Sequence, residues 1–116
     1  MIRVFIVDDH PLLVEGIRSL LLQQTDIEVI GYATAAESCL KQLLSQKVDV
    51  ILMDIGLPDM SGIDLCAEIK LRHPAVIILA VSSFHEGCYI KKMMNSGANG
   101  YIFKDAGCGD LVEGIK

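Results

Sequence analysis

The chain has 116 residues, of which 52% are hydrophobic and 22% are charged, and its formal net charge is −5 at pH 7. This length suits one domain that buries roughly two thirds of the surface of its extended chain, and the apolar content excludes a disordered chain. The acidic balance argues against a basic nucleic-acid-binding face. The longest apolar runs are far shorter than the roughly 20 residues of a membrane-spanning helix.

The first half of the chain alternates between apolar runs of strand length and segments with helical periodicity. Residues 4–7 predict a strand that ends at two aspartates, and Pro11 suits the first turn of the helix that follows. A second strand is predicted over Ile27–Ala33 and a second helix from Ala36, where apolar residues recur at helical spacing. A third strand, over 48–53, ends at another aspartate.

The second half repeats this alternation. Ser61 is expected to cap the next helix, because a hydroxyl side chain suits the N-cap position. A fourth strand is predicted over 76–81 and a fifth over Gly100–Phe103, after a turn that contains Gly97. The helix between these two strands is expected to place three apolar residues on one face: Ile90, Met93 and Met94. A last helix is expected to open near Gly109.

Strict alternation of strands and helices implies one α/β domain, with a parallel sheet covered by helices on both faces. Crossovers between parallel strands are right-handed, so few topologies remain. We therefore expect a flavodoxin-like (βα)5 doubly wound parallel sheet with strand order 2-1-3-4-5. Ligands of such sheets bind beyond the carboxyl ends of the strands, where the strand order reverses. Here that point lies between the first and third strands.

Acidic and polar side chains follow four of the predicted strands and should meet at one edge of the sheet: Asp8, Asp9, Asp54, Ser82 and Lys104. Clustered carboxylates repel one another unless a cation lies between them, and Mg²⁺ prefers carboxylate and phosphate oxygens. A carboxylate beside Mg²⁺ can attack phosphorus and form an acyl phosphate, while an ammonium group neutralises charge on the phosphoryl oxygens. The set therefore predicts phosphorylation of an aspartate.

These residues occur together with Leu57-Pro58, Gly62 and the segment Gly97-Ala98-Asn99-Gly100-Tyr101. In this combination the sequence resembles the receiver domain of bacterial two-component response regulators over nearly its whole length. The opening Val7-Asp8-Asp9-His10-Pro11 and the pair Lys104-Asp105 are similar to the nitrate-response-type (LuxR/NarL-like) subfamily. Members of that subfamily carry a helix-turn-helix output domain.

The resemblance implies that Asp54 is the phosphoacceptor and also a Mg²⁺ ligand. Asp9 is then the main acidic ligand, Asp8 assists it, partly through water, and the backbone carbonyl of Gly56 completes the protein's ligand set. Gly56 offers no side chain at a position that shapes access to the aspartyl phosphate, and Phe84 is bulky where several relatives are polar. The sequence therefore leaves the lifetime of the phosphoryl group open.

The resemblance also implies that the Ser82 hydroxyl bonds the phosphoryl group and that the Lys104 ammonium pairs with it. Ser83 competes for the hydroxyl role, and the spacing favours Ser82. Tyr101 stands at the position of the switch aromatic, which turns inward when the hydroxyl moves toward the phosphate. Asp105 follows Lys104 where many receivers have proline, so no cis peptide bond is expected there.

A receiver is a signalling module rather than an enzyme, because it catalyses only its own phosphotransfer and dephosphorylation. The resemblance implies a sensor histidine kinase as phosphodonor and a homodimer on phosphorylation. Residues 1–116 are then the receiver domain. The last helix reaches Lys116 after only about two turns, so we expect the protein to continue into a C-terminal helix-turn-helix domain. That domain, and not the receiver, would bind DNA and control transcription.

The cysteines suggest a reducing compartment. They are widely spaced, without a Cys-x-x-Cys pair, at positions Cys39, Cys66, Cys88 and Cys108. This spacing indicates neither a zinc site nor a redox motif. Reduced thiols are typical of cytoplasmic proteins, so we expect a cytoplasmic chain with no membrane association.

Other functions fit the residues less well. A haloacid-dehalogenase-type phosphatase needs Asp-x-Asp after the first strand, which Asp8-Asp9-His10 does not supply, and a flavodoxin needs a Ser/Thr-rich phosphate loop there. The remaining alternative is a stand-alone receiver or pseudo-receiver that acts through protein–protein interaction, although the full acidic set with Ser82 and Lys104 speaks against a pseudo-receiver. For His10, the sequence favours a loop or capping role over metal ligation.

Overall fold

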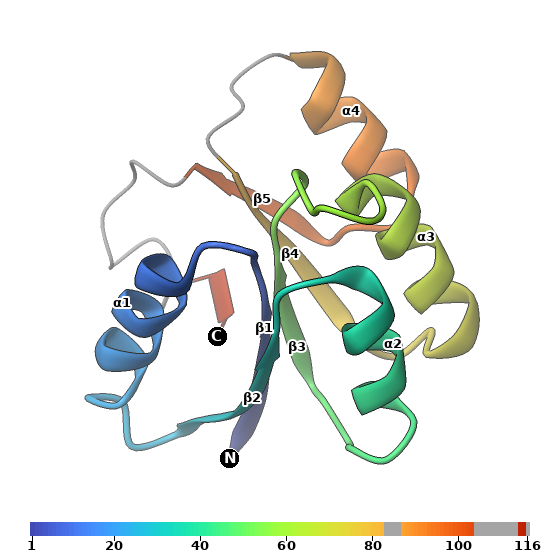
Figure 1. The fold of residues 1–116 in the computed structure, drawn as a ribbon. Coiled ribbons are helices and arrows are strands. Elements are labelled where there is room, and N and C mark those ends of the chain that lie inside the picture. The colour runs from blue at the N-terminus through green and yellow to red at the C-terminus, as the bar shows by residue number, and fades with distance from the viewer. Residues whose placement is uncertain (83–86, 104–113, 116) are drawn as a thin grey trace.

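The computed structural model describes residues 1–82, 87–103 and 114–115, and within them five strands form one parallel sheet in the order β2-β1-β3-β4-β5 (Figure 1). The strands are β1 (Ile2–Val7), β2 (Ile27–Ala33), β3 (Val50–Met53), β4 (Ile77–Ser82) and β5 (Gly100–Phe103). The helices are α1 (Pro11–Leu21), α2 (Ala36–Leu43), α3 (Gly62–Arg72) and α4 (Gly87–Asn95). The predicted fold and strand order are confirmed, and the predicted last helix falls largely outside the described residues.

Helices cover both faces of the sheet, with α2, α3 and α4 on one side and α1 on the other (Figure 1). Side chains of β1 alternate between the two cores: Phe5 and Val7 belong to the core under α2, α3 and α4, whereas Val4 and Ile6 belong to the core under α1. Because both faces are buried, the central strands read as continuous apolar runs. In the part of the chain that the structure describes, no helix combines the length and the apolar character needed to cross a bilayer.

Three strand boundaries differ from the prediction. β1 begins two residues early, because Ile2 already pairs with Ile27 of β2. β3 begins later than expected, since its ladder with β1 starts at the pair Val4–Val50, and Val48 is buried without belonging to the strand. β4 lies one residue further along the chain than predicted. Burial of an apolar side chain therefore extends slightly beyond the hydrogen-bonded ladder.

Helix ends follow local sequence signals. Pro11 occupies the first turn of α1, and the Ser61 hydroxyl caps α3 by accepting a hydrogen bond of 3.2 Å from the Ile63 amide. Both predictions are confirmed, as is a glycine turn after α4, where Gly97 has φ of 107°. The prediction for the face of α4 is partly wrong: Met93 is fully buried but Met94 is 44% exposed. Consecutive helical residues point about 100° apart, so only one of the two can face the sheet.

Candidate functional site

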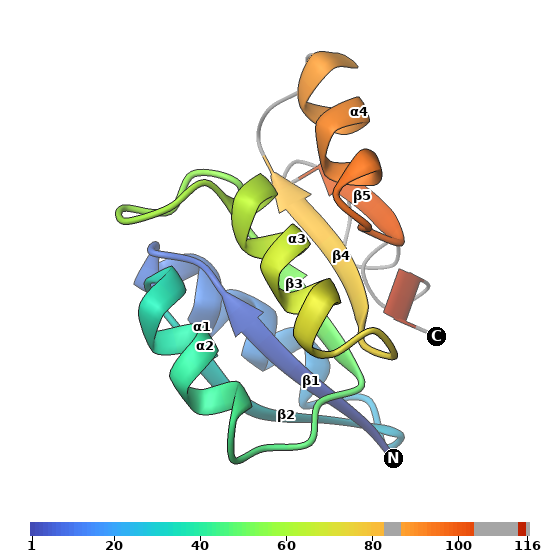
Figure 2. The same ribbon diagram turned by 90° about the vertical axis from the view of Figure 1, so that its right-hand side faces the viewer.

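The acidic site lies where β1 and β3 end side by side. Asp8 directly follows β1 and Asp54 directly follows β3, and backbone hydrogen bonds continue the sheet to both residues, from Asp8 N to Ala33 O and from Asp54 N to Val7 O. The side chains of Asp8 and Asp54 are 3% and 4% exposed. Figure 2 shows the arrowheads of β1 and β4 at the same end of the sheet. Parallel strands thus bring residues that are 46 positions apart into one pocket.

Four side chains converge on this pocket. Asp8, Asp9, His10 and Asp54 each contribute one ligand-type atom, and these atoms all lie within 4.8 Å of one another. The three carboxylates were predicted to meet here, and the structure brings them together. His10 joins them although the sequence pointed to a loop or capping role.

His10 does not cap α1 with its side chain. It stands at the N-cap position, but only its backbone carbonyl accepts hydrogen bonds from the helix, at the amides of Leu13 and Val14. Its imidazole turns the other way, with Nδ1 2.7 Å from Asp8 Oδ1 and 3.1 Å from Asp9 Oδ1. The His10 backbone N–H also donates to Asp8 Oδ1 at 2.8 Å. The ring is therefore held over the carboxylates.

One buried carboxylate oxygen in the pocket has no hydrogen-bond partner among the described residues. Asp9 Oδ1 is buried and accepts no hydrogen bond from the residues that the structure describes, even though His10 Nδ1 is 3.1 Å away. Buried polar atoms in folded proteins nearly always have a partner. Together with the crowding of three carboxylates, this oxygen indicates a place for a cation.

A tight loop after β3 fixes the backbone of Asp54. Gly62 at the start of α3 donates its N–H to the Ile55 carbonyl at 2.7 Å, and Gly56 forms an isolated antiparallel bridge with Ser61. A Cβ atom on Gly62 would lie 2.1 Å from the Asp54 carbonyl oxygen. Only glycine allows α3 to approach this closely. The sequence marked Gly62 through its motif, but the contact that requires it is visible only in the structure.

The same loop is tied to α2 by a carboxylate that the sequence did not single out. Asp59 accepts hydrogen bonds from the backbone N–H groups of Ala36, at 2.8 Å, and Glu37, at 3.1 Å. These bonds lower the pKa of Asp59. Ala35 occupies the N-cap position of α2, but its methyl group cannot cap the helix. Asp59, which lies 24 residues after Ala35 in the sequence, supplies the cap instead. Because alanine cannot cap a helix, Ala35 before the predicted helix was a sign that a residue from another segment supplies the cap.

The other predicted site residues are only partly described. Ser82 ends β4 at the same edge of the sheet and is fully buried. Tyr101 in β5 is partly buried, and its ring packs edge-to-face on Phe103 with centroids 5.6 Å apart. Lys104 lies outside the described residues, together with the predictions for Ser83, Phe84 and Asp105.

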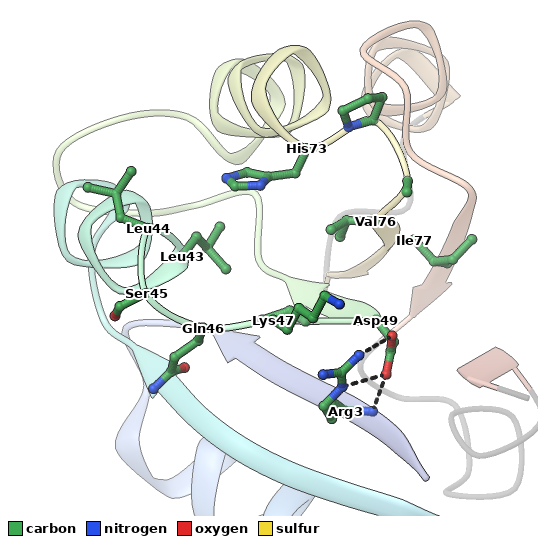
Figure 3. Close-up of a pocket in the computed structure, with 13 residues that line it drawn as sticks. Arg3, Leu43, Leu44, Ser45, Gln46, Lys47, Asp49, His73, Val76 and Ile77 are labelled. Atoms are coloured by element: carbon green, nitrogen blue, oxygen red, sulfur yellow. Dashed lines mark hydrogen bonds and ion pairs between the residues drawn. The ribbon is translucent and has the colours of Figure 1, made fainter.

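An open groove of about 900 Å³ lies at the amino ends of the strands, at the end of the sheet opposite the acidic site (Figure 3). Arg3 and Asp49 on its floor satisfy each other, because the Asp49 carboxylate accepts hydrogen bonds from the backbone N, Nε and Nη2 of Arg3 at 2.8, 3.1 and 3.1 Å. These bonds lower the pKa of Asp49. The groove contains none of the acidic-site residues, and we assign it no ligand.

The described cysteines form no site. Cys39 and Cys66 are buried, and burial raises their pKa values to about 12 and about 11, so both remain protonated thiols at neutral pH. Cys88 is exposed on α4. All three are free cysteines, and Cys108 lies outside the described residues.

Known proteins resemble this chain in sequence along nearly its whole length. Response regulator GacA of Pseudomonas viridiflava is 34% identical over 116 residues, which cover 100% of this chain and 54% of that protein. Transcriptional regulatory protein DegU of Brevibacillus brevis is 30% identical over 115 residues, covering 99% of this chain and 49% of that protein. The chain thus spans about half the length of these curated relatives.

Solved structures show the same fold. The signal receiver domain of the putative response regulator NarL from Mycobacterium tuberculosis has a TM-score of 0.92 at 27% identity, over 98% of this chain and 92% of that one. The family model described as the response regulator receiver domain matches residues 4–116. With its strand order and its acidic pocket at the switch point of the sheet, the chain belongs to the response regulator receiver domain family of two-component systems.

Proposed function

We propose that this chain accepts a phosphoryl group on Asp54 in a Mg²⁺-dependent reaction and that the modified residue switches the conformation of the domain. The observation that carries the proposal is the convergence of buried Asp54 with Asp8 and Asp9 within 4.8 Å, in a chain of the receiver family. Such a cluster exceeds what helix capping requires. Receiver domains bind Mg²⁺ at an acidic pocket, and an Asp-rich pocket is present here.

The residues fit Mg²⁺. The ion prefers oxygen ligands and commonly takes one or two carboxylates, as Asp9 and Asp54 would provide, with Asp8 assisting and the Gly56 carbonyl in the adjoining loop. The orphaned Asp9 Oδ1 is an oxygen of the required kind. When bound, Mg²⁺ neutralises negative charge on the carboxylates and on the phosphoryl oxygens.

In this proposal, a carboxylate oxygen of Asp54 attacks the phosphorus atom and forms a new O–P bond, while the leaving group departs with the electron pair of the broken bond. The Ser82 hydroxyl donates a hydrogen bond to the arriving phosphoryl group, and the Lys104 ammonium pairs with its charge. Support comes from the position of Ser82 at the end of β4 and of Lys104 directly after β5 in the sequence. Tyr101 then follows Ser82 inward as the switch aromatic.

The wider role is also a proposal. The relatives are named as a response regulator and a transcriptional regulatory protein, and each is about twice as long as this chain. We infer that the chain is cytoplasmic, that its partner is a sensor histidine kinase, and that it forms a homodimer on phosphorylation. DNA binding would occur through a C-terminal helix-turn-helix domain. A stand-alone receiver that acts through protein contacts is the alternative, and the gene sequence beyond codon 116 distinguishes the two.

Intact-mass measurement tests the chemistry. The protein is incubated with Mg²⁺ and acetyl phosphate or phosphoramidate, and we expect a gain of one phosphoryl group that EDTA prevents. The gain should vanish in Asp54→Asn and persist in the matched control Asp64→Asn, which neutralises an exposed carboxylate on α3. Equal labelling of Asp54→Asn, with a native circular dichroism spectrum, would refute the proposal.

A further inference from the structure

The imidazole of His10 contacts the carboxylates of the acidic pocket although much of the ring is exposed to solvent. Its backbone N–H is tied to Asp8, and Pro11 fixes the chain direction immediately after it. Nδ1 lies 2.7 Å from Asp8 Oδ1, 3.1 Å from Asp9 Oδ1 and 3.8 Å from Asp54 Oδ2. The His10 side chain as a whole is 62% exposed, so the ring lies at the mouth of the pocket with Nδ1 toward the carboxylates.

We propose that His10 Nδ1 is a metal ligand of this pocket and that it shifts the preference of the site from Mg²⁺ toward borderline transition-metal ions such as Co²⁺, Ni²⁺ or Zn²⁺. This inference rests on the proposed function, because it uses the same carboxylates. Adjacent donor atoms around one ion lie about 3 Å apart when the bonds are about 2.1 Å long. The Nδ1 distances to Asp8 and Asp9, 2.7 and 3.1 Å, have this spacing.

The donor chemistry sets the expected selectivity. Carboxylate and carbonyl oxygens suit Mg²⁺, whereas imidazole nitrogen suits the later divalent ions of the first transition row. A pocket with oxygen donors alone gains less from exchanging Mg²⁺ for Co²⁺ than a pocket that adds an imidazole. His10 is therefore the residue that would determine how strongly this site discriminates between the two metals.

A competing role for the ring is that of a built-in cation that blocks the pocket. The hydrogen bonding argues against it. His10 Nδ1 carries at most one hydrogen, and its shortest contact is with Asp8, so Asp9 Oδ1 remains without a hydrogen bond. The ring therefore leaves Asp9 Oδ1 without a hydrogen bond among the described residues. One ion bonded to the imidazole nitrogen and to Asp9 Oδ1 would satisfy this oxygen.

Calorimetric titration of the protein with Co²⁺ and, separately, with Mg²⁺ tests the proposal. We expect His10→Ala to weaken Co²⁺ binding by about tenfold more than it weakens Mg²⁺ binding, because the lost imidazole is a donor that Co²⁺ favours over Mg²⁺. His10→Gln should behave in the same way, because it keeps an N–H donor for Asp8 but has no imidazole. The matched control is His73→Ala, which removes a histidine from the groove at the opposite end of the sheet.

Any other combination of Co²⁺ and Mg²⁺ affinities in His10→Ala contradicts the proposal. Unchanged Co²⁺ affinity in His10→Ala means that the ring is no ligand, tighter Mg²⁺ binding means that it blocks the site, and equal losses for both metals mean that it only positions Asp8. Pulsed EPR of the Mn²⁺-loaded protein gives a second readout, since a ¹⁴N coupling should be present in the wild type and in His73→Ala and absent in His10→Ala. Phosphorylation of the wild-type protein with Mg²⁺ and acetyl phosphate separates the two proposals: its absence would contradict the proposed function, whereas the role of His10 is decided by the Co²⁺ and Mg²⁺ titrations.

Discussion

The two ends of the central sheet treat their carboxylates in opposite ways. At the amino end, Asp49 accepts three hydrogen bonds from Arg3, and the pair ties the start of β1 to the segment before β3. At the carboxyl end, Asp8, Asp9 and Asp54 crowd together, and one buried oxygen has no hydrogen bond within the described residues. The first end satisfies its charges within the protein, and the second leaves charge for a ligand.

This difference separates stability from function. Like charges at short distance raise the free energy of the folded state unless a cation joins them. Natural proteins keep such unfavourable arrangements where a functional site requires them, and other interactions in the fold offset the loss of stability. We therefore expect substitutions at the two ends to change stability in opposite directions, and bound metal to stabilise only through the carboxyl end.

The largest effect should come from the glycine that holds the Asp54 loop. Gly62→Ala would place a Cβ atom 2.1 Å from the Asp54 carbonyl oxygen, so the loop or α3 must move. We expect a loss of about 3 kcal/mol in the free energy of unfolding, measured by urea denaturation, together with weaker Mg²⁺ binding. Gly16→Ala is the matched control, since its Cβ would meet no atom within 4 Å on the exposed face of α1, and it should stabilise by about 0.5 kcal/mol. Similar stabilities of the two variants would contradict the close packing.

Neutralising Asp54, the proposed phosphoacceptor, should have the next largest effect. In EDTA, Asp54→Asn should be more stable than the wild type by about 1 kcal/mol, because one of three crowded charges is removed. Asp49→Asn should be less stable, since Arg3 loses its charged partner. Thermal unfolding with and without Mg²⁺ measures both, and Mg²⁺ should raise the midpoint of the wild type more than that of Asp54→Asn. Destabilisation by Asp54→Asn in EDTA would show that crowding is not the dominant feature of the pocket.

The smallest effect should come from the amino end. Arg3 and Asp49 are 37% and 40% exposed, so water and salt screen the pair, and Arg3→Ala should lower stability only slightly at neutral pH. Arg3 lowers the pKa of Asp49, so the stability that this carboxylate contributes is present above its unfolded pKa of about 3.9 and is lost as the pH falls through its lower folded pKa. The wild-type and Arg3→Ala stabilities, compared by urea denaturation, should thus converge in acid. A difference that persists below that range would mean that Arg3 acts by packing instead.

Much of this architecture could be read from the sequence. Buried parallel strands are continuous apolar runs, so five of them alternating with helical segments predicted the sheet order, and the residues after β1 and β3 predicted the acidic cluster. Strand ends and the outward turn of Met94 were missed, because apolar residues also occur outside the hydrogen-bonded ladder and away from the core.

The contacts that needed the structure are those between segments that the sequence does not relate. Asp59 reaches the amides of Ala36 and Glu37 only because the loop after β3 passes the start of α2. The direction of the His10 ring depends on how α1 leaves β1, and composition carries no information about it. Glycine is likewise required at position 62 because the Asp54 carbonyl lies close to it in space, and the sequence does not reveal this contact.

The most direct test of the central claim is to locate the modified carboxylate chemically. Borohydride reduces an aspartyl phosphate to homoserine, so peptide mass spectrometry after reaction with acetyl phosphate, Mg²⁺ and borohydride identifies the residue that carried the phosphoryl group. We predict homoserine at position 54 and unchanged aspartate at positions 8 and 9. Homoserine at Asp8 or Asp9, or a phosphorylated protein that yields none, would contradict the assignment of Asp54.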